Sequence, residues 1–180
     1  MQVGKSSKMN ELVSDMQCSF EIDPKMIKLK QKINEGNFGT VWLAVWQQVG
    51  MGDTEVAVKQ MKARGKQEMY DLKNELPLLF RAASRCNNVC KLHGVAELDG
   101  KLSIVMSYYP GGNITEYMAD YLQTQGTALP WGKIRKFSLA ICRGMQELHD
   151  HRIVFQDLKC DNVLLDKYQT AHIADFGALR

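Results

Sequence analysis

The chain has 180 residues, 45% of them hydrophobic and 24% charged, which is ordinary for a folded protein with one or two small cores. The formal net charge of +3 is small, and no dense lysine or arginine block suggests nucleic-acid binding. No apolar run approaches the ~20 residues of a membrane span, and Met1–Asn10 lacks the apolar core of a signal peptide. We therefore expect a soluble, cytoplasmic protein with no membrane segment and no nucleic-acid partner.

The first half of the chain has the pattern of a small sheet. Residues 1–20 are read as a flexible lead-in. Alternating apolar or β-branched residues predict five strands, at 26–33, 40–46, 55–61, 89–98 and 101–108. Asp99-Gly100 predicts a tight turn between the last two. Residues 66–84 predict a helix that Pro77 must kink or shorten, because proline lacks a backbone donor.

After Pro110-Gly-Gly112, a break in the pattern, the sequence becomes helical. Apolar residues at three- and four-residue spacing predict a helix whose apolar face belongs to the core; they are Trp131, Ile134, Phe137, Ile141, Met145 and Leu148. The later apolar runs at 153–154, 163–165 and 171–173 are too short for helices. The expected class is α+β: five strands and one helix, followed by a mainly helical part.

The most informative residues lie near the end of the chain. Asp157-Leu-Lys-Cys-Asp-Asn162 is followed by Asp175-Phe-Gly177. Aspartate and asparagine offer the hard oxygen ligands that Mg²⁺ prefers, and Asp157 is suited to accept the proton of an attacking hydroxyl. Upstream lie a glycine-bearing loop, Gly36 to Gly39, and Val56-Ala-Val-Lys59, so the combination is far more specific than any one motif.

In these motifs the chain resembles a eukaryotic protein kinase over residues 21–180. The resemblance implies a two-lobed fold, with a flexible lead-in at 1–20, an N-terminal lobe at 21–108 and a partial C-terminal lobe at 109–180. It also implies binding of ATP and Mg²⁺ and transfer of a phosphoryl group to a protein. Since the kinase fold continues beyond the Asp-Phe-Gly motif, we expect this chain to be an incomplete domain, a fragment whose activity alone is doubtful.

The resemblance assigns the nucleotide-binding residues. Lys59 would hold the ATP phosphates and pair with Glu75, with Glu68 as the competing partner. The loop over the phosphates would comprise Ile33, Gly36, Asn37, Phe38, Gly39 and Val41. Asn34 occupies the place of the family's first glycine, where we expect its tolerance of positive φ to preserve the turn. Val41, Ala57 and Leu164 or Leu165 would lie against the adenine ring, Met106 would lie beside it, and backbone groups around Ser107 to Tyr109 would hydrogen-bond to it.

The resemblance also assigns the catalytic loop and one departure from it. Asp157 would orient the hydroxyl, Lys159 would neutralise phosphate charge, and Asn162 and Asp175 would bind Mg²⁺. Kinases usually carry His-Arg-Asp where this chain has Phe155-Gln-Asp157. The arginine normally pairs with a phosphorylated activation loop, so Gln156 predicts activity that does not depend strongly on such phosphorylation. Phe155 would replace the bulk of the histidine.

Asp-Leu-Lys-x-x-Asn resembles serine/threonine kinases, and Glu21-Ile-Asp-Pro24 with Phe-Gln-Asp is most like Raf-like members of the tyrosine-kinase-like group. The expected function is therefore transfer to a serine or threonine hydroxyl of a protein substrate in signalling. A pseudokinase scaffold and a short nucleotide-binding regulatory module without transfer activity are the alternatives. We read His149-Asp-His151 as a helix cap, and Asp161 and Asp166 as solvated loop acids. The five cysteines form no zinc pattern or disulfide framework and are expected to be reduced.

Overall fold

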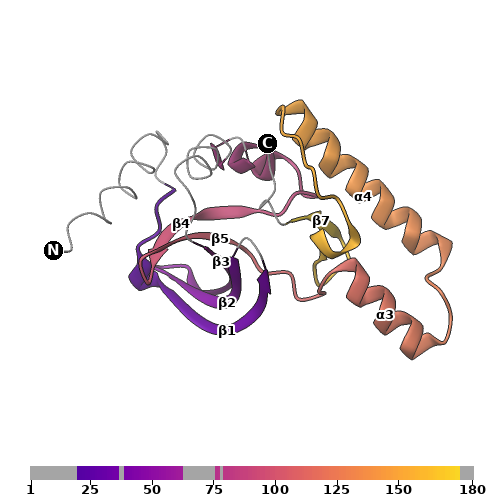
Figure 1. Ribbon diagram of the computed structural model, residues 1–180, viewed down its shortest axis with the longest axis horizontal. Helices are drawn as coiled ribbons and strands as arrows, with labels where there is room; N and C mark the ends of the chain where they lie inside the picture. Colours follow the sequence, from indigo (N-terminus) through magenta and orange to yellow (C-terminus); the bar gives the residue numbers. More distant parts are fainter. Residues whose placement is uncertain (1–19, 37–38, 63–75, 78, 175–180) are drawn as a thin grey trace. The chain divides into compact units, whose positions relative to one another are not determined.

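A computed structural model of the chain describes residues 20–36, 39–62, 76–77 and 79–174 (Figure 1). The described residues belong to two compact units. The first lies within Met1–Pro77 and Leu92–Tyr108, and the second within Leu78–Lys91 and Tyr109–Arg180. The lobe limits inferred from the sequence, 21–108 and 109–180, stay a prediction.

The first unit is an antiparallel sheet of five strands, the number that the sequence predicted, and their order is β1-β2-β3-β5-β4. A one-turn 3-10 helix, Pro24–Met26, leads into it, and Pro24 begins this turn because its fixed φ suits a first helical position. The strands are β1 (Ile27–Gly36), β2 (Gly39–Gln48), β3 (Gly52–Met61), β4 (Leu92–Leu98) and β5 (Lys101–Ser107). Asp99 and Gly100 both have positive φ in the two-residue β4–β5 turn, as a type I′ hairpin requires.

Side chains along β3 alternate between the two faces of the sheet. Val56 and Val58 are fully buried in an apolar cluster, and because successive side chains point to opposite faces, Ala57 and Lys59 lie on the other face. The buried members of this cluster are Ile22, Ile27, Ala44, Val56, Val58, Ala96, Leu98 and Val105. The β1–β2 pairing has two register shifts, between Leu29 and Gln31 and between Lys32 and Asn34, a feature that the sequence does not predict.

The residues before β1 pair with the free edge of β4. Ile22 N–H donates to the Val95 carbonyl, and Val95 N–H donates to the Phe20 carbonyl, both at 2.9 Å. Gly94 makes this approach possible, because a Cβ there would lie 2.4 Å from the Phe20 oxygen. The segment around Glu21 is therefore part of the fold.

The helices of the second unit include α3 (Ile114–Gln125) and α4 (Trp131–Asp150). The sequence analysis missed α3. Its N-terminus carries a capping box, in which the Asn113 side chain accepts from Glu116 N–H and the Glu116 carboxylate accepts from Asn113 N–H. Its C-terminus is capped by Gly126 in the left-handed conformation. Asn113-x-x-Glu116 followed by Gly126 was the available signal.

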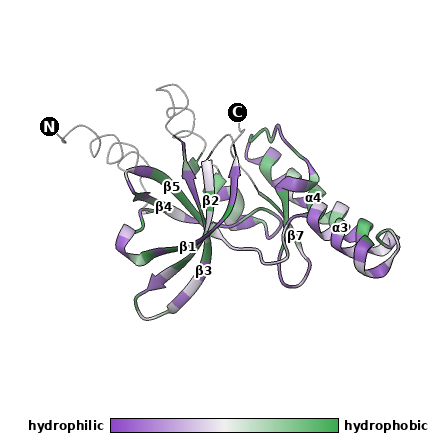
Figure 2. Cartoon of the chain, turned by 60° about the horizontal axis from the view of Figure 1, so that its bottom comes forward, coloured by the Kyte–Doolittle hydropathy of each residue, from purple (hydrophilic) through white to green (hydrophobic). Residues whose placement is uncertain are grey.

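The predicted apolar face of α4 is only partly buried. Phe137 and Leu148 are in the core, but the Trp131 and Ile134 side chains are 75% and 40% exposed, so the prediction for these two was wrong. The buried positions include two small residues instead, Ala140 and Gly144. Small residues allow close approach: a Cβ on Gly144 would lie 2.6 Å from the Asn88 carbonyl oxygen. Figure 2 shows that α3 and α4 each carry both hydrophilic and hydrophobic residues.

Two short strands complete the second unit, β6 (Val163–Leu165) and β7 (Ala171–Ile173), paired antiparallel. Residues 76–77 and 79–85 are helical and coincide with the end of the helix predicted at 66–84 to within one residue, while 63–75 lie outside the described residues. The predicted strand at 89–98 begins only at Leu92, because Val89 bridges to Ile173 and Cys90 N–H donates to the Ile173 carbonyl. No helix in the described part of the chain is long and apolar enough to cross a membrane.

Candidate active site

Three of the predicted residues converge within the second unit. Lys159 Nζ lies 2.8 Å from Asp157 Oδ2, and Asn162 Nδ2 donates to the same oxygen at 3.0 Å. Asn162 Nδ2 also donates to the Asp157 backbone carbonyl at 2.8 Å. Asp157 and Lys159 precede a single 3-10 turn, Cys160–Asn162, which folds the chain back so that Asn162 reaches them. The six-residue motif is therefore a compact hydrogen-bonded unit.

The contacts of Asp157 fit a group that accepts a proton. Its hydrogen bond with Lys159 holds the pKa of the carboxyl below its usual range, and the bond from Asn162 acts in the same direction. Asp157 is therefore ionised at neutral pH. Both side-chain donors use Oδ2, and the carboxylate is partly exposed, so Oδ1 is placed to accept from a hydroxyl of another molecule.

Asn162 has the properties of a fixed oxygen ligand. It is only 5% exposed, its backbone N–H donates to the Lys159 carbonyl, and its own carbonyl accepts from Ala174 N–H at 2.8 Å. Because the amide nitrogen is committed to Asp157, the side-chain oxygen is the atom left for a cation. An amide oxygen suits Mg²⁺, so this residue fits the metal. Asp175, the second proposed ligand, follows Ala174 and lies outside the described residues.

Lys59 lies on β3 in the first unit, where its Cα is opposite Val41 on β2 and Ile104 on β5. It is only 7% exposed, which is unusual for a lysine and is not the solvated strand-end position common for this residue. Burying an ammonium group is costly unless it has an ionic partner. Its predicted partner Glu75, and the alternative Glu68, lie outside the described residues.

The glycine loop connects β1 and β2, with Gly36 opposite Gly39 in the register. Asn37 and Phe38, at its tip, lie outside the described residues. Asn34 belongs to β1 opposite Val41, and it is not among the residues with positive φ, so the expected left-handed conformation there was wrong. A strand position explains this, because ladder pairing keeps φ negative.

The proposed adenine contacts are divided between the units. In the first unit, Ala57 and Met106 are both buried and are Cα partners across β3 and β5, while Ser107 Oγ lies 3.0 Å from His93 Nε2. Ile33, by contrast, is 47% exposed on β1. In the second unit, the segment after Tyr109 runs beside β6, because Gly111 N–H donates to the Leu165 carbonyl and Asn113 bridges to Leu164.

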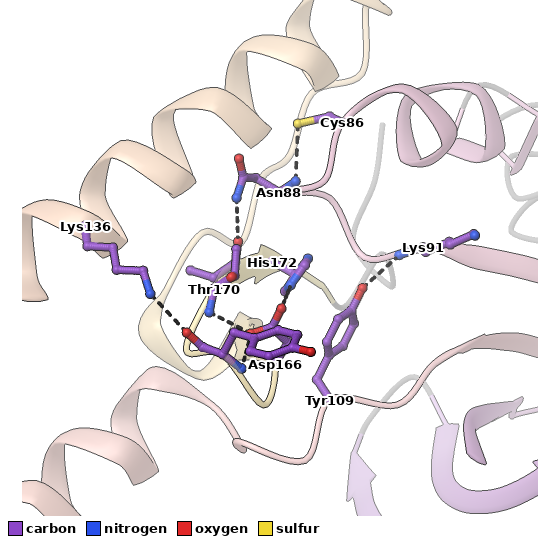
Figure 3. A network of polar contacts seen from close by, with 10 residues as sticks. Cys86, Asn88, Lys91, Tyr109, Lys136, Asp166, Thr170 and His172 are labelled. Atoms are coloured by element: carbon purple, nitrogen blue, oxygen red, sulfur yellow. Dashed lines mark hydrogen bonds and ion pairs between the residues drawn. The ribbon is translucent and has the colours of Figure 1, made fainter. Parts of the chain in front are cut away.

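A polar network that the sequence analysis missed lies beside Tyr109 (Figure 3). Asp166 was read as a solvated acid, but its Oδ1 accepts from the N–H groups of Tyr168 and Thr170, both at 2.8 Å, and its Oδ2 lies 3.4 Å from His172 Nε2. The ring of His172 stacks on Tyr109 with centroids 4.3 Å apart. The Tyr109 hydroxyl accepts from Lys91 N–H at 3.2 Å. The network joins segments far apart in sequence, which local patterns do not reveal.

The titration of this network follows from its burial. Burial lowers the pKa of His172 more than the Asp166 carboxylate raises it, so the histidine is neutral at pH 7. Burial raises the pKa of Asp166, but the hydrogen bonds from Thr170, Tyr168 and His172 together lower it by more. The pKa of this carboxyl therefore lies below its usual range. The pair is thus an ionised acid beside a neutral imidazole.

The remaining predictions for this region concern Phe155, Gln156 and the helix end. Phe155 is buried at 7% exposure and Gln156 is exposed, consistent with a packing role for the first. His151 caps α4, as predicted: its N–H donates to the Glu147 carbonyl and its Nδ1 lies 3.0 Å from the same oxygen. The described cysteines at 86, 90, 142 and 160 are free thiols, as expected, and no group of three metal-binding side chains occurs among the described residues.

Comparison with known proteins agrees with this arrangement. The profile of the protein tyrosine and serine/threonine kinase family matches residues 27–180. A probable serine/threonine-protein kinase of Dictyostelium discoideum is 28% identical over 95% of this chain and 17% of its own length. Tyrosine-protein kinase JAK3 of Rattus norvegicus is 32% identical over 86% of the chain and 14% of its length. Serine/threonine-protein kinase STY46 of Arabidopsis thaliana is 29% identical over 89% and 26%.

These relatives include kinases of both specificities, so the Raf-like subgroup stays a prediction, and the chain spans less than a third of their length. The match covers both the sheet unit and the Asp157–Asn162 loop. The chain therefore belongs to the protein tyrosine and serine/threonine kinase family.

Proposed function

We propose that the chain carries the ATP-binding and catalytic residues of a protein serine/threonine kinase. The reaction transfers the γ-phosphoryl group of ATP to a protein hydroxyl: the bond from the γ-phosphorus to the bridging oxygen breaks, and a bond to the hydroxyl oxygen forms. ADP leaves and the hydroxyl gives up its proton. The observation that carries this proposal is the fixed Asp157 carboxylate, bound through Oδ2 by Lys159 and Asn162.

Asp157 would orient the attacking hydroxyl and accept its proton through Oδ1. Lys159, whose amine is half exposed beside that carboxylate, would also reach the γ-phosphate and reduce its charge. Most of the rate enhancement in phosphoryl transfer comes from positioning and electrostatics, so a preorganised pair of this kind is what the reaction needs. The hydrogen bonds of Asn162 to Asp157 would set the angle of the carboxylate.

In the first unit, Lys59 would bind the α- and β-phosphates, paired with Glu75. Mg²⁺, held by Asn162 and Asp175, would neutralise charge between the phosphates. The loop from Gly36 to Gly39, with Ile33, Asn37, Phe38 and Val41, would cover them. The adenine would contact Val41, Ala57, Met106, Ser107, Tyr109 and Leu164.

The preference for serine or threonine is supported by Lys159 within Asp-Leu-Lys-x-x-Asn, which resembles the serine/threonine kinases. Relatives of both kinds match, so a direct comparison of hydroxyl acceptors is needed. A pseudokinase scaffold is the second candidate, favoured by the exposed Gln156 where the family has arginine. Phosphoryl transfer to a peptide distinguishes the two.

The test uses the full-length protein with radiolabelled ATP and matched peptides that differ only in serine, threonine or tyrosine. Asp157→Asn should lower the turnover number by a factor on the order of 10² to 10⁴, since a positioned proton acceptor contributes that much, while ATP binding persists. Asp161→Asn is the matched control, because this neighbouring carboxylate is exposed. Near-normal turnover of Asp157→Asn would refute the catalytic assignment, and transfer only to tyrosine would refute the specificity.

A further inference from the structure

A cluster of lysines and tyrosines lies on the second unit, away from the Asp157 loop in sequence. We call it the lysine–tyrosine patch; its members are Tyr117 and Tyr121 of α3, Lys133 and Lys136 of α4, and Lys167 and Tyr168 of the β6–β7 turn. Three separate elements thus contribute three ammonium groups and three aromatic rings to one surface. None of these residues belongs to the proposed phosphoryl-transfer site.

Lys133 is the centre of the patch. Its Nζ donates to the Tyr117 hydroxyl and to Gln169 Oε1, both at 2.7 Å. It also lies 5.3 Å from the centre of the Tyr117 ring and 5.8 Å from that of Tyr121, within the range of cation–π attraction. All of these partners are neutral, so the positive charge is held firmly in place without being neutralised.

The other two lysines surround the same turn. Lys136 Nζ donates to the Tyr168 carbonyl at 3.1 Å, a contact drawn in Figure 3. Lys167 Nζ lies 5.0 Å from the centre of the Tyr168 ring, which is 71% exposed. Both lysines are exposed, and neither has a carboxylate among its contacts in the described part of the chain.

Two carboxylates of the surrounding elements, Asp166 and Glu116, are already occupied. Asp166 uses both oxygens within the β6–β7 turn, on the N–H groups of Tyr168 and Thr170 and on His172. Glu116 is committed to the capping box of α3. Among the described residues, none of the three lysines contacts a carboxylate. Three grouped cations repel one another, and a negatively charged partner would relieve this repulsion.

We propose that the lysine–tyrosine patch binds an acidic peptide segment of a partner protein. The carboxylates of such a segment would pair with Lys136 and Lys167, while its apolar atoms would lie on the exposed ring of Tyr168. Charge complementarity and exposed aromatic area are what recognition of a short acidic segment requires. A peptide fits better than nucleic acid, because the patch is small and the whole chain carries a net charge of only +3.

The experiment measures fluorescence anisotropy of a labelled peptide of alternating glutamate and tyrosine with the full-length protein, at low and at physiological ionic strength. The test variant is Lys136→Gln with Lys167→Gln, which leaves the half-buried Lys133 intact. Lys136→Arg with Lys167→Arg keeps the charges. Lys28→Gln with Lys30→Gln, exposed on β1, removes the same charge elsewhere. Circular dichroism verifies that each variant is folded.

The glutamine pair should weaken peptide binding by about fivefold or more, because it removes two ion pairs with the peptide, each of which contributes modestly at an exposed site. The arginine pair and the β1 pair should bind within about twofold of the parent protein, and salt should weaken binding. Equal weakening in the β1 pair, or no peptide binding by the parent protein, would overturn the proposal. So would tighter binding to single-stranded nucleic acid or to phosphatidylserine vesicles. The assay needs no phosphoryl transfer, so its result is independent of the proposed function.

Discussion

At the scale of single residues, Gly36 and Gly39 flank the same hairpin tip but have different surroundings. A Cβ on Gly39 would lie 2.2 Å from the Gln60 carbonyl oxygen, a backbone atom that cannot move without shifting β3. A Cβ on Gly36 would meet no atom of the described residues within 4 Å, its chain neighbours aside. The fold therefore requires a glycine at position 39 and not at position 36, where the open backbone is free for a phosphate.

The two alanine variants should separate stability from nucleotide binding. Gly39→Ala should lower the free energy of unfolding by about 1–3 kcal/mol, the usual cost of a forced steric overlap, as measured by urea denaturation. Gly36→Ala should leave it unchanged within about 0.5 kcal/mol but weaken ATP binding, as measured by calorimetry. Equal loss of stability in both variants would contradict this distinction.

At the scale of secondary-structure elements, the capping box at the N-terminus of α3 determines where this helix begins. The side chains of Asn113 and Glu116 satisfy two backbone donors at the start of a helix whose only buried residue is Ile114. Since apolar packing contributes little to this helix, the cap should account for an unusual share of its stability.

Asn113→Ala should therefore lower the free energy of unfolding by about 1 kcal/mol, because an N-cap side chain typically contributes that amount. Thr115→Ala provides a matched control: it also removes a polar side chain at the start of α3 but leaves the capping box in place. Thermal unfolding followed by circular dichroism compares the two. A larger loss in Thr115→Ala than in Asn113→Ala would show that the cap is unimportant.

The β6–β7 network should make stability sensitive to mild acid. The pKa of His172 is lower in the folded protein than its ordinary value of about 6.5, which applies in the unfolded chain. As the pH falls through that value, the unfolded chain therefore binds more protons than the folded protein. The stabilisation is complete above that value and is lost below it. The lowered pKa of Asp166 adds a further loss at more acidic pH, with the same sign.

Urea unfolding at about pH 7.5 and about pH 5.5 should show a lower free energy of unfolding in acid, a change that His172→Gln reduces, since glutamine does not titrate. His149→Gln is the control, because His149 is an exposed histidine near the end of α4. If His149→Gln reduced the acid effect as much as His172→Gln, the network would not be its source.

At the scale of the whole molecule, features that depend on local sequence were predictable, and those that depend on tertiary packing were not. The five strands were predictable because alternation and the Asp99-Gly100 turn are local signals, and the Asp157–Asn162 contacts because the motif folds on itself within six residues. The exposure of Trp131 was not, because periodicity identifies an apolar face but not whether anything covers it. The Asp166–His172–Tyr109 network was missed because it depends on non-local packing.

Gln156 bears on how phosphorylation would regulate the whole protein. Gln156 is exposed and carries no charge, so it cannot form the ion pair by which a phosphorylated activation loop is usually ordered. Phosphatase treatment of the full-length protein should leave most of its activity, measured as phosphate transfer to a peptide. Gln156→Arg should make the activity sensitive to the same treatment. Complete loss of activity in the unsubstituted protein after phosphatase treatment would refute the prediction.

The pairing of Phe20 and Ile22 with Val95 has a practical consequence for producing this protein. β4 is a terminal strand of the sheet, and without that pairing its backbone donors and acceptors would be open to a strand of another molecule. Shortened versions that begin after Ile22 should therefore self-associate at high concentration. Expression boundaries should be set upstream of Phe20, even though the family match begins only at residue 27.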